Sequence, residues 1–143
     1  YKRQTLVDEG FTVLPYINAD PLLARRLQDV GAATVMPLGS PIGSNLGIQN
    51  RKQIEIIIEQ ATVPVIIDAG IGKPSHACEA MEIGADAVLI NTEIAISSNP
   101  IKISKAFKGS IENGRTDFLF GSQETSFKGS ATSPLSTFLF END

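Results

Sequence analysis

The sequence has little of several residue types that mark particular classes of protein. It contains no tryptophan and one cysteine, and aromatic residues make up 6% of the chain. A single cysteine cannot form an internal disulfide, which excludes a disulfide scaffold and favours a reducing compartment. No apolar run reaches the roughly 18 residues that cross a membrane. The sequence therefore predicts neither a disulfide-rich domain nor a membrane-spanning protein.

Positive charge is also in short supply. Twelve Lys and Arg residues face 16 Asp and Glu residues, which gives a net charge of −4. Proteins that bind nucleic acids or anionic membranes are usually basic, so we expect neither partner. One His and one Cys cannot assemble a zinc site from those residue types alone, so we expect no metal.

The remaining composition is that of a globular domain. The 143 residues are 42% hydrophobic and 20% charged. A chain of this length can bury roughly two thirds of its unfolded surface, so it forms one domain at most. The first residue is Tyr1 rather than Met, and we expect that an N-terminal segment is absent from this sequence.

Four short apolar runs predict β-strands with little polar alternation, which is typical of a parallel sheet covered by helices. They are Thr12–Ile17, Ala33–Met36, Val63–Asp68 and Ala85–Asn91. Helical patterns lie between them, and cap residues set their ends. We expect helices to begin at Asp20-Pro21, Asn50, Pro74-Ser75 and Asn99-Pro100. We expect the first, third and fourth of these to end at Gly31, Gly84 and Asn113-Gly114, and Lys2–Glu9 to form the last turns of another helix.

Strict alternation of strands and helices predicts an α/β fold with a parallel sheet. A complete (β/α)8 TIM barrel needs about 250 residues, or about 31 per unit, so four units are close to half of one. A lone half-barrel would leave two unpaired edge strands, which favours a portion of a longer protein. We expect residues 1–120 to form the half-barrel and residues 121–143 to be a C-terminal extension without clear periodicity.

Ligands of parallel α/β folds lie beyond the carboxyl ends of the strands, so we expect ligand-binding residues in the loops that lead from strand to helix. Residues 37–47 hold three glycines, Gly43 among them, and two serines. Such a loop brings backbone N–H groups close to an anion. The alternative is an ordinary flexible loop.

The third strand ends in Asp68, followed by Ala69-Gly70-Ile71-Gly72 and the start of a helix. The glycines permit close approach to a phosphate, and a helix N-terminus favours its charge. Asp68 is placed for acid/base work, because a carboxylate there is costly unless it is used or paired. The alternative is that Asp68 only accepts hydrogen bonds from the neighbouring backbone.

The fourth strand ends in Asn91-Thr92. The last two strand loops of a barrel commonly share a phosphate site, so Gly70 and Asn91-Thr92 are expected to face the same phosphate.

We expect structural rather than catalytic roles for several other polar or aromatic residues. We expect Asp20 to be a helix cap, and Tyr16 and Phe107 to lie in the core. His76 and Cys78 stand two apart in a helix and point in different directions. For Lys73 two interpretations are open: it contacts an anion, or it is an exposed residue at the start of a helix.

Several segments closely resemble the thiazole synthases of bacterial and plastid thiamin biosynthesis. The resemblance runs from about Leu6 to Pro134. Its motifs are Leu14–Pro21 (LPYINADP), Met36–Ser44 (MPLGSPIGS), Val63–Gly72 (VPVIIDAGIG) and Gly84–Thr92 (GADAVLINT), with Glu112–Arg115 and Ser133-Pro134 further along.

The resemblance implies a (β/α)8 TIM barrel enzyme. It would condense 1-deoxy-D-xylulose 5-phosphate with dehydroglycine (2-iminoacetate) and sulfur from the C-terminal thiocarboxylate of a sulfur-carrier protein, making the thiazole phosphate moiety of thiamin. The residues implied to contact substrate, chiefly its phosphate, are Gly43, Ala69, Gly70, Asn91 and Thr92. Asp68 is implied to be a catalytic acid/base group, and no cofactor is implied.

The same resemblance implies partners and a location. The partners are the sugar phosphate, the sulfur-carrier protein, a dehydroglycine-forming enzyme and further copies of the chain in a homo-oligomer. The location is the cytoplasm or a plastid (chloroplast).

The sequence departs from the family in two respects. The family holds its sugar phosphate as an imine on a strand lysine that lies before the helix ending near Gly10. Position 1 of this sequence comes after that lysine. The chain therefore resembles strands five to eight with their helices, and we expect it alone to be inactive. Lys73, solvated at a helix start, is a poor substitute nucleophile. The end, Leu135–Asp143, also departs from the family.

Two other functions remain open from the sequence. One is a different phosphate-binding TIM-barrel isomerase or lyase that uses Asp68 directly, without an imine. The other is a non-catalytic half-barrel remnant that pairs with a second copy through its strand edges.

Overall fold

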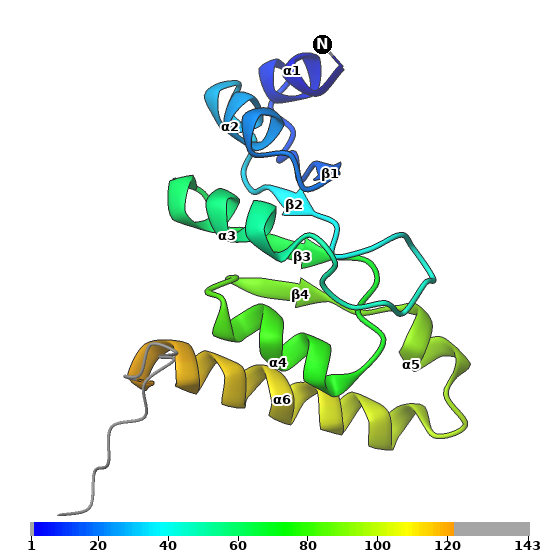
Figure 1. Ribbon diagram of the computed structural model, residues 1–143. Helices are drawn as coiled ribbons and strands as arrows, with labels where there is room; N and C mark the ends of the chain where they lie inside the picture. Colours follow the sequence, from blue (N-terminus) through cyan, green and yellow to red (C-terminus); the bar gives the residue numbers. More distant parts are fainter. Residues whose placement is uncertain (1, 122–143) are drawn as a thin grey trace, which may run out of the picture.

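The computed structural model describes residues 2–121 and shows alternating strands and helices (Figure 1). In chain order the elements are α1 (Lys2–Asp8), β1 (Tyr16–Ile17), α2 (Pro21–Asp29), β2 (Met36–Pro37), α3 (Arg51–Gln60), β3 (Ile66–Asp68), α4 (Pro74–Glu82), β4 (Ala87–Leu89), α5 (Thr92–Ile96) and α6 (Pro100–Phe120). The predicted α/β order is confirmed, although each strand is shorter than its apolar run. The expected extension, apart from Gly121, lies outside the described residues, as do Ser133-Pro134 and Leu135–Asp143.

All four strands run parallel and follow chain order in space. β1 pairs with β2 and β3 pairs with β4, both in parallel. Two parallel bridges, Val35 to Val65 and Leu38 to Asp68, join β2 to β3. Figure 1 shows the strands in sequence from β1 to β4. The carboxyl ends of all four therefore lie at one edge of the sheet.

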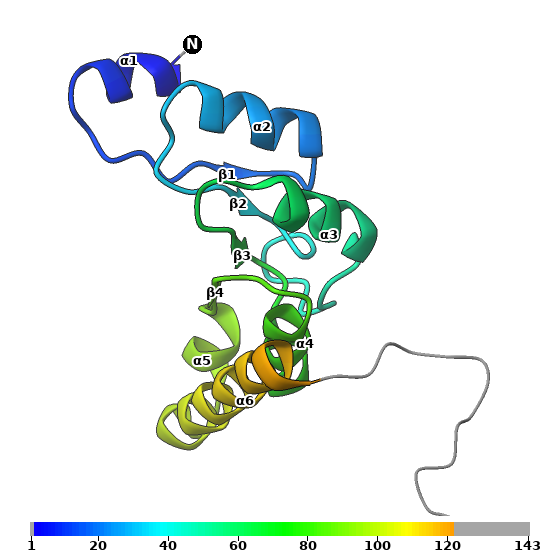
Figure 2. The ribbon, with the colours of Figure 1, turned by 90° about the vertical axis from the view of Figure 1, so that its left-hand side faces the viewer.

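Only one face of the strands is covered by helices in the described part of the chain. In Figure 2, α2, α3 and α4 lie on one side of the strands. Ile17 and Ile67, which point to that side, are 4% and 0% exposed, whereas Tyr16 and Leu89 are 36% and 41% exposed. Successive strand residues point to opposite faces, so this difference follows from the one-sided cover. The expectation of Tyr16 in the core is therefore wrong.

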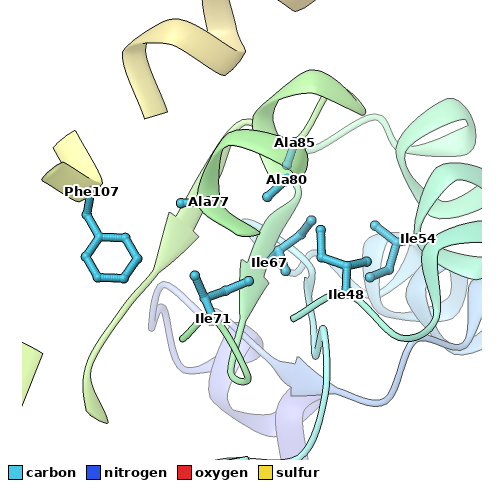
Figure 3. Packing of buried hydrophobic residues seen from close by; sticks show 8 residues of the cluster. All are labelled: Ile48, Ile54, Ile67, Ile71, Ala77, Ala80, Ala85 and Phe107. Atoms are coloured by element: carbon cyan, nitrogen blue, oxygen red, sulfur yellow. The ribbon is translucent and has the colours of Figure 1, made fainter. Parts of the chain in front are cut away.

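The core lies between the strands and their helices. One cluster joins β3, α4 and α6 (Figure 3) and consists of Ile48, Ile54, Ile67, Ile71, Ala77, Ala80, Ala85 and Phe107. Phe107 is 2% exposed, which confirms its expected place. A second cluster, around Ile17, Leu27 and Val35, packs α2 and α3 against β1 and β2. The two clusters anchor the strands whose ends carry the loops described below.

Capping residues set several helix boundaries as expected. The side chain of Asp20 accepts hydrogen bonds from the backbone N–H groups of Leu22 (2.9 Å) and Leu23 (3.1 Å), which confirms it as the cap of α2. Asn50 does occupy the N-cap position of α3, but its side chain makes no capping hydrogen bond. Asn99 caps α6 by accepting from the N–H of Lys102 at 3.0 Å.

Helix α6 does not end where the sequence predicts. Asn113-Gly114 was expected to stop it, yet the helix continues to Phe120. Gly114 is buried against α4, where a β-carbon would overlap the carbonyl oxygen of Cys78 and lie 3.0 Å from the Cβ of Met81. The glycine therefore permits close packing of two helices instead of ending one.

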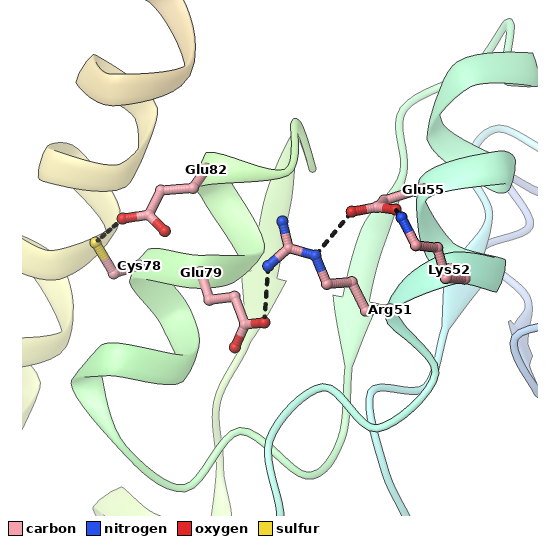
Figure 4. Close-up of polar contacts among 6 residues, drawn as sticks. All are labelled: Arg51, Lys52, Glu55, Cys78, Glu79 and Glu82. Atoms are coloured by element: carbon pink, nitrogen blue, oxygen red, sulfur yellow. Dashed lines mark hydrogen bonds and ion pairs between the residues drawn. The ribbon is translucent and has the colours of Figure 1, made fainter. Parts of the chain in front are cut away.

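Ion pairs connect α3 to α4 on the outer surface (Figure 4). The Arg51 Nε donates to Glu55 at 2.7 Å within α3, and its Nη1 donates to Glu79 of α4 at 3.2 Å. Lys52 also pairs with Glu55, at 3.0 Å. The Arg51 side chain is 51% exposed, so each pair contributes about 1 kcal/mol or less.

Candidate active site

Asp68 is the last residue of β3 and lies at the carboxyl edge of the sheet. In the strand register its neighbours on either side are Leu38 and Leu89, both apolar. Partial burial raises the pKa of the Asp68 carboxyl above its ordinary value, while a hydrogen bond from the Ala69 N–H works against that rise. Desolvation disfavours the charged form, so the carboxyl holds its proton to a higher pH than an exposed aspartate does.

The chain turns sharply directly after Asp68. Ala69 and Gly70 have φ values of +73° and +78°, both in the left-handed region. A non-glycine residue there is strained, and such strain is concentrated at functional sites. Gly70 is buried so tightly that a β-carbon on it would overlap the side chain of Ser40. The turn is thus held in an unusual conformation by its surroundings.

The loop between β2 and α3 folds over this turn and is tied to it by backbone hydrogen bonds. The N–H of Gly47 donates to the Gly70 carbonyl at 2.8 Å, and that of Gly39 donates to the Asp68 carbonyl at 3.3 Å. Within the loop the hydroxyls of Ser40 and Ser44 share a hydrogen bond of 3.0 Å. These ties hold the loop against the turn, and its contact with a ligand stays a prediction.

Asn91 and Thr92 follow β4 and lead into the short helix α5, which the sequence analysis did not separate from the later helix. Asn91 stands at the N-cap position without a side-chain capping bond, and it is exposed. Its amide is therefore not used by the helix and is available to a ligand.

A pocket of about 260 Å³ lies where these segments meet. All six residues expected in the site line it: Gly43, Asp68, Ala69, Gly70, Asn91 and Thr92. The structure thus brings together three loops that are well separated in the sequence. Their contact with a substrate stays a prediction.

The pocket has further lining residues that the sequence analysis did not select. They are Ile42, Asn45, Ile71 and Leu89. Ile42 and Asn45 belong to the loop already singled out, and Ile71 to the glycine turn. Leu89 is the register partner of Asp68, which a strand alignment could have indicated.

Three residues that line the pocket have backbone N–H groups without a partner among the described residues. Among residues 2–121 nothing accepts a hydrogen bond from the N–H groups of Gly43, Gly70 or Ile71. Gly70 and Ile71 are buried, and buried donors in native proteins are nearly always paired. No Lys or Arg side chain from the described part of the chain lines the pocket. An anion held there would be bound by backbone N–H groups and the polar side chains of the fourth-strand loop.

Lys73, His76 and Cys78 lie outside the pocket. Lys73 is exposed at the N-cap position of α4. His76 Nδ1 accepts from the N–H of Gly72 at 3.3 Å, while the thiol of Cys78 donates to Glu82 at 3.2 Å. Residues 2–121 contain no cluster of His, Cys, Asp and Glu suited to a metal ion. Within the same range, no helix combines the length and apolar character that crossing a membrane requires.

Comparison with known proteins shows the family. A family model described as "Thiazole biosynthesis protein ThiG" matches residues 2–134. The chain is 61% identical over 136 residues to the thiazole synthase of Syntrophobacter fumaroxidans, covering 95% of this chain and 53% of that protein. It is 56% identical over 136 residues to the thiazole synthase of Escherichia coli K12, with the same coverage. The chain therefore spans about half the length of the curated relatives it matches.

Solved structures with TIM-barrel-type folds are similar to the chain. The Amycolatopsis orientalis BexX/CysO complex superposes with a TM-score of 0.84 at 34% identity, over 87% of this chain and 51% of that chain. The (S)-3-O-geranylgeranylglyceryl phosphate synthase of Thermoplasma acidophilum, solved with sn-glycerol-1-phosphate, gives a TM-score of 0.58 at 23% identity. It covers 64% of this chain and 36% of that chain, and at this identity it shows the fold alone. Because the family model covers nearly all of its length, the chain belongs to the thiazole biosynthesis ThiG family.

Proposed function

We propose that the complete protein is a thiazole synthase and that this chain supplies the phosphate-binding half of its active site. The reaction condenses 1-deoxy-D-xylulose 5-phosphate, dehydroglycine and carrier-bound sulfur into the thiazole phosphate of thiamin. Family membership and the relatives named thiazole synthase support the activity. The four strands would be the last four of a (β/α)8 barrel.

The single observation that carries this proposal is the pocket beyond β3 and β4. It gathers the residues expected to hold a phosphate and places two buried, unpaired N–H donors, those of Gly70 and Ile71, beside them. Concave groups of backbone N–H donors are a common means of binding phosphate. A phosphate ester in the pocket would satisfy donors that the described residues leave unpaired.

Asp68 is the group in the pocket best suited to move protons. Its raised pKa brings the carboxyl closer to neutrality, where one group can both give and accept a proton. We infer that it acts as the acid/base residue in the rearrangements that follow imine formation.

The imine-forming lysine is proposed to lie outside these residues. No lysine of residues 2–121 lines the pocket, and the nearest in sequence, Lys73, is exposed at the start of α4. A primary amine that attacks a ketone must reach the bound sugar from within the site. The strand preceding α1 in the complete protein is the proposed source.

The proposed partners follow from the reaction. They are a sulfur-carrier protein with a C-terminal thiocarboxylate and an enzyme that forms dehydroglycine, with the synthase itself a homo-oligomer. The BexX protein, at 34% identity, was solved in complex with a second protein, CysO, which supports a protein partner for this family. The relatives named above are bacterial, which favours the bacterial cytoplasm over a plastid.

Borohydride trapping tests this division of roles. The 143-residue chain and the complete protein are each incubated with 1-deoxy-D-xylulose 5-phosphate, reduced with borohydride and analysed by intact mass. We expect an adduct on the complete protein alone. Its Asp68→Asn variant should still form the adduct but turn over far more slowly.

The other outcomes contradict specific parts of the proposal. An adduct on the 143-residue chain would place the nucleophile within it. No adduct on either protein would favour a phosphate-binding isomerase or lyase without an imine, or a non-catalytic remnant. An Asp68→Asn variant with normal turnover would remove the acid/base role.

A further inference from the structure

A side-chain hydrogen bond links two of the segments that form the pocket. The Asn45 Nδ2 donates to the Glu93 Oε2 at 3.1 Å, across 48 positions of sequence. Asn45 belongs to the loop after β2, which carries Gly43. Glu93 lies in the first turn of α5, directly after Asn91 and Thr92. The loop after β2 and the start of α5 are therefore tied together.

Asn45 is held in a constrained position. Its φ is +53°, in the left-handed region that Asn adopts more readily than most residues. Its side chain packs so closely on Gly72 that a β-carbon there would overlap it. Asn45 is thus held between the turn that follows β3 and the helix that follows β4, and it contacts both.

Glu93 is a negative charge next to a site proposed to bind an anion. The residue is half-buried and does not itself line the pocket, although Asn91 and Thr92 before it do. A carboxylate in this place disfavours anion binding by charge alone. Its presence therefore needs a compensating role, and the bond to Asn45 supplies one.

We propose that Asn45 and Glu93 are positioning residues that set the spacing of Gly43 against Asn91 and Thr92 around the phosphate ester. This inference rests on the proposed function and adds to it two residues outside the expected site. Neither needs to touch the substrate. The hydrogen bond orders the two loops before the ligand arrives, which lowers the ordering cost of binding.

The decisive variant is Glu93→Ala in the complete protein, because charge and positioning predict opposite signs. Removing a carboxylate strengthens phosphate-ester binding if charge alone matters. Loss of the hydrogen bond weakens it, by about tenfold for a bond to a charged group. We expect the KM for 1-deoxy-D-xylulose 5-phosphate to rise about tenfold with kcat changed less than twofold. Unchanged or tighter binding would overturn the positioning role.

A swapped pair tests the bond itself. Asn45→Asp alone sets two carboxylates against each other and should weaken binding at least as much. Adding Glu93→Gln reverses donor and acceptor, because the Gln amide donates to the Asp carboxylate, and should restore the KM to within about threefold of wild type. A double variant as weak as Asn45→Asp alone would overturn the proposal.

A matched control and a ligand-free readout complete the test. Glu112→Ala removes a helix carboxylate that pairs with Lys108 at 3.6 Å, and it should leave the KM unchanged. Hydrogen exchange at the Gly47 amide, which donates to Gly70, should be faster in Glu93→Ala without any ligand. Equal exchange rates would contradict the ordering of the loop.

These outcomes separate the two proposals. A wild-type complete protein that binds neither the sugar phosphate nor inorganic phosphate would overturn the proposed function, and the positioning role with it. A wild type that binds, with a Glu93→Ala variant that binds equally well, would overturn the positioning role alone.

Discussion

At the scale of single residues, the apolar neighbours of Asp68 make its ionisation depend on folding. Leu38 and Leu89 flank it in the sheet, and burial raises the pKa of its carboxyl above the ordinary value. The folded protein then binds this proton more tightly than the unfolded chain does. Its contribution to stability is therefore full below the unfolded pKa, about 4, and is lost as the pH rises through the folded pKa.

The prediction is that Asp68→Asn becomes more stable relative to wild type as the pH rises. The variant cannot ionise at this position, so it escapes the desolvation cost that wild type incurs above about pH 4. Urea unfolding of both proteins between pH 3.5 and 7.5 measures the difference in unfolding free energy. A difference that stays constant over this range, or that shrinks as the pH rises, would contradict it.

At the scale of elements, the packing of α6 on α4 depends on Gly114. Changing an interior helix glycine to alanine usually stabilises by about 0.5–1 kcal/mol. Gly114→Ala should instead destabilise the chain by roughly 1–3 kcal/mol, because its β-carbon would overlap the Cys78 carbonyl. Gly109 on the same helix has no atom within 4 Å of its β-carbon position, so Gly109→Ala should stabilise. Thermal unfolding of both variants checks the opposite signs; two shifts in the same direction would refute the packing role.

The same glycine shows what the sequence could and could not predict about elements. Asn113-Gly114 has the local chemistry of a helix end, and only contact with α4, more than 30 residues earlier, reveals its other use. The caps at Asp20 and Asn99 were predictable because they act within three residues of themselves. Strand lengths were overestimated, because the outer residues of the apolar runs form only isolated bridges or single hydrogen bonds, as Val35 does with Val65, and do not extend the ladders.

The candidate site also contains some residues that the sequence could predict and others that it could not. Gly43, Asp68, Gly70 and Asn91 were predictable because glycines and polar residues directly follow apolar strands, and the resemblance named the same positions. The pairing of Asn45 with Glu93 could not be predicted. Neither residue belongs to a recognisable sequence motif, and only the fold brings the two together.

At the scale of the whole molecule, one face of the sheet is left without helices over residues 2–121. Leu14 and Tyr16 alternate with the buried Pro15 and Ile17, so they share the exposed face, as does Leu89. Exposed apolar faces and unpaired strand edges favour association. We predict that the isolated 143-residue chain self-associates and that Leu14→Lys raises its monomer fraction.

Sedimentation velocity at several concentrations measures that fraction. Leu22→Lys is the matched control, because Leu22 is 72% exposed on α2, away from the sheet, and its replacement should change nothing. A wild-type chain that stays monomeric at all concentrations, or two variants with equal effects, would contradict the prediction.

The parallel strands follow one another in space in the order of the chain, and this has a consequence for how the molecule forms. Each strand pairs with the strand before it: β1 with β2, β2 with β3 and β3 with β4. Each of these pairings closes one strand–helix unit of about 20 to 30 residues, so none has to wait for a distant part of the chain. Each strand and helix can therefore dock on the unit made just before it, so that the structure grows in one direction as the ribosome releases the chain.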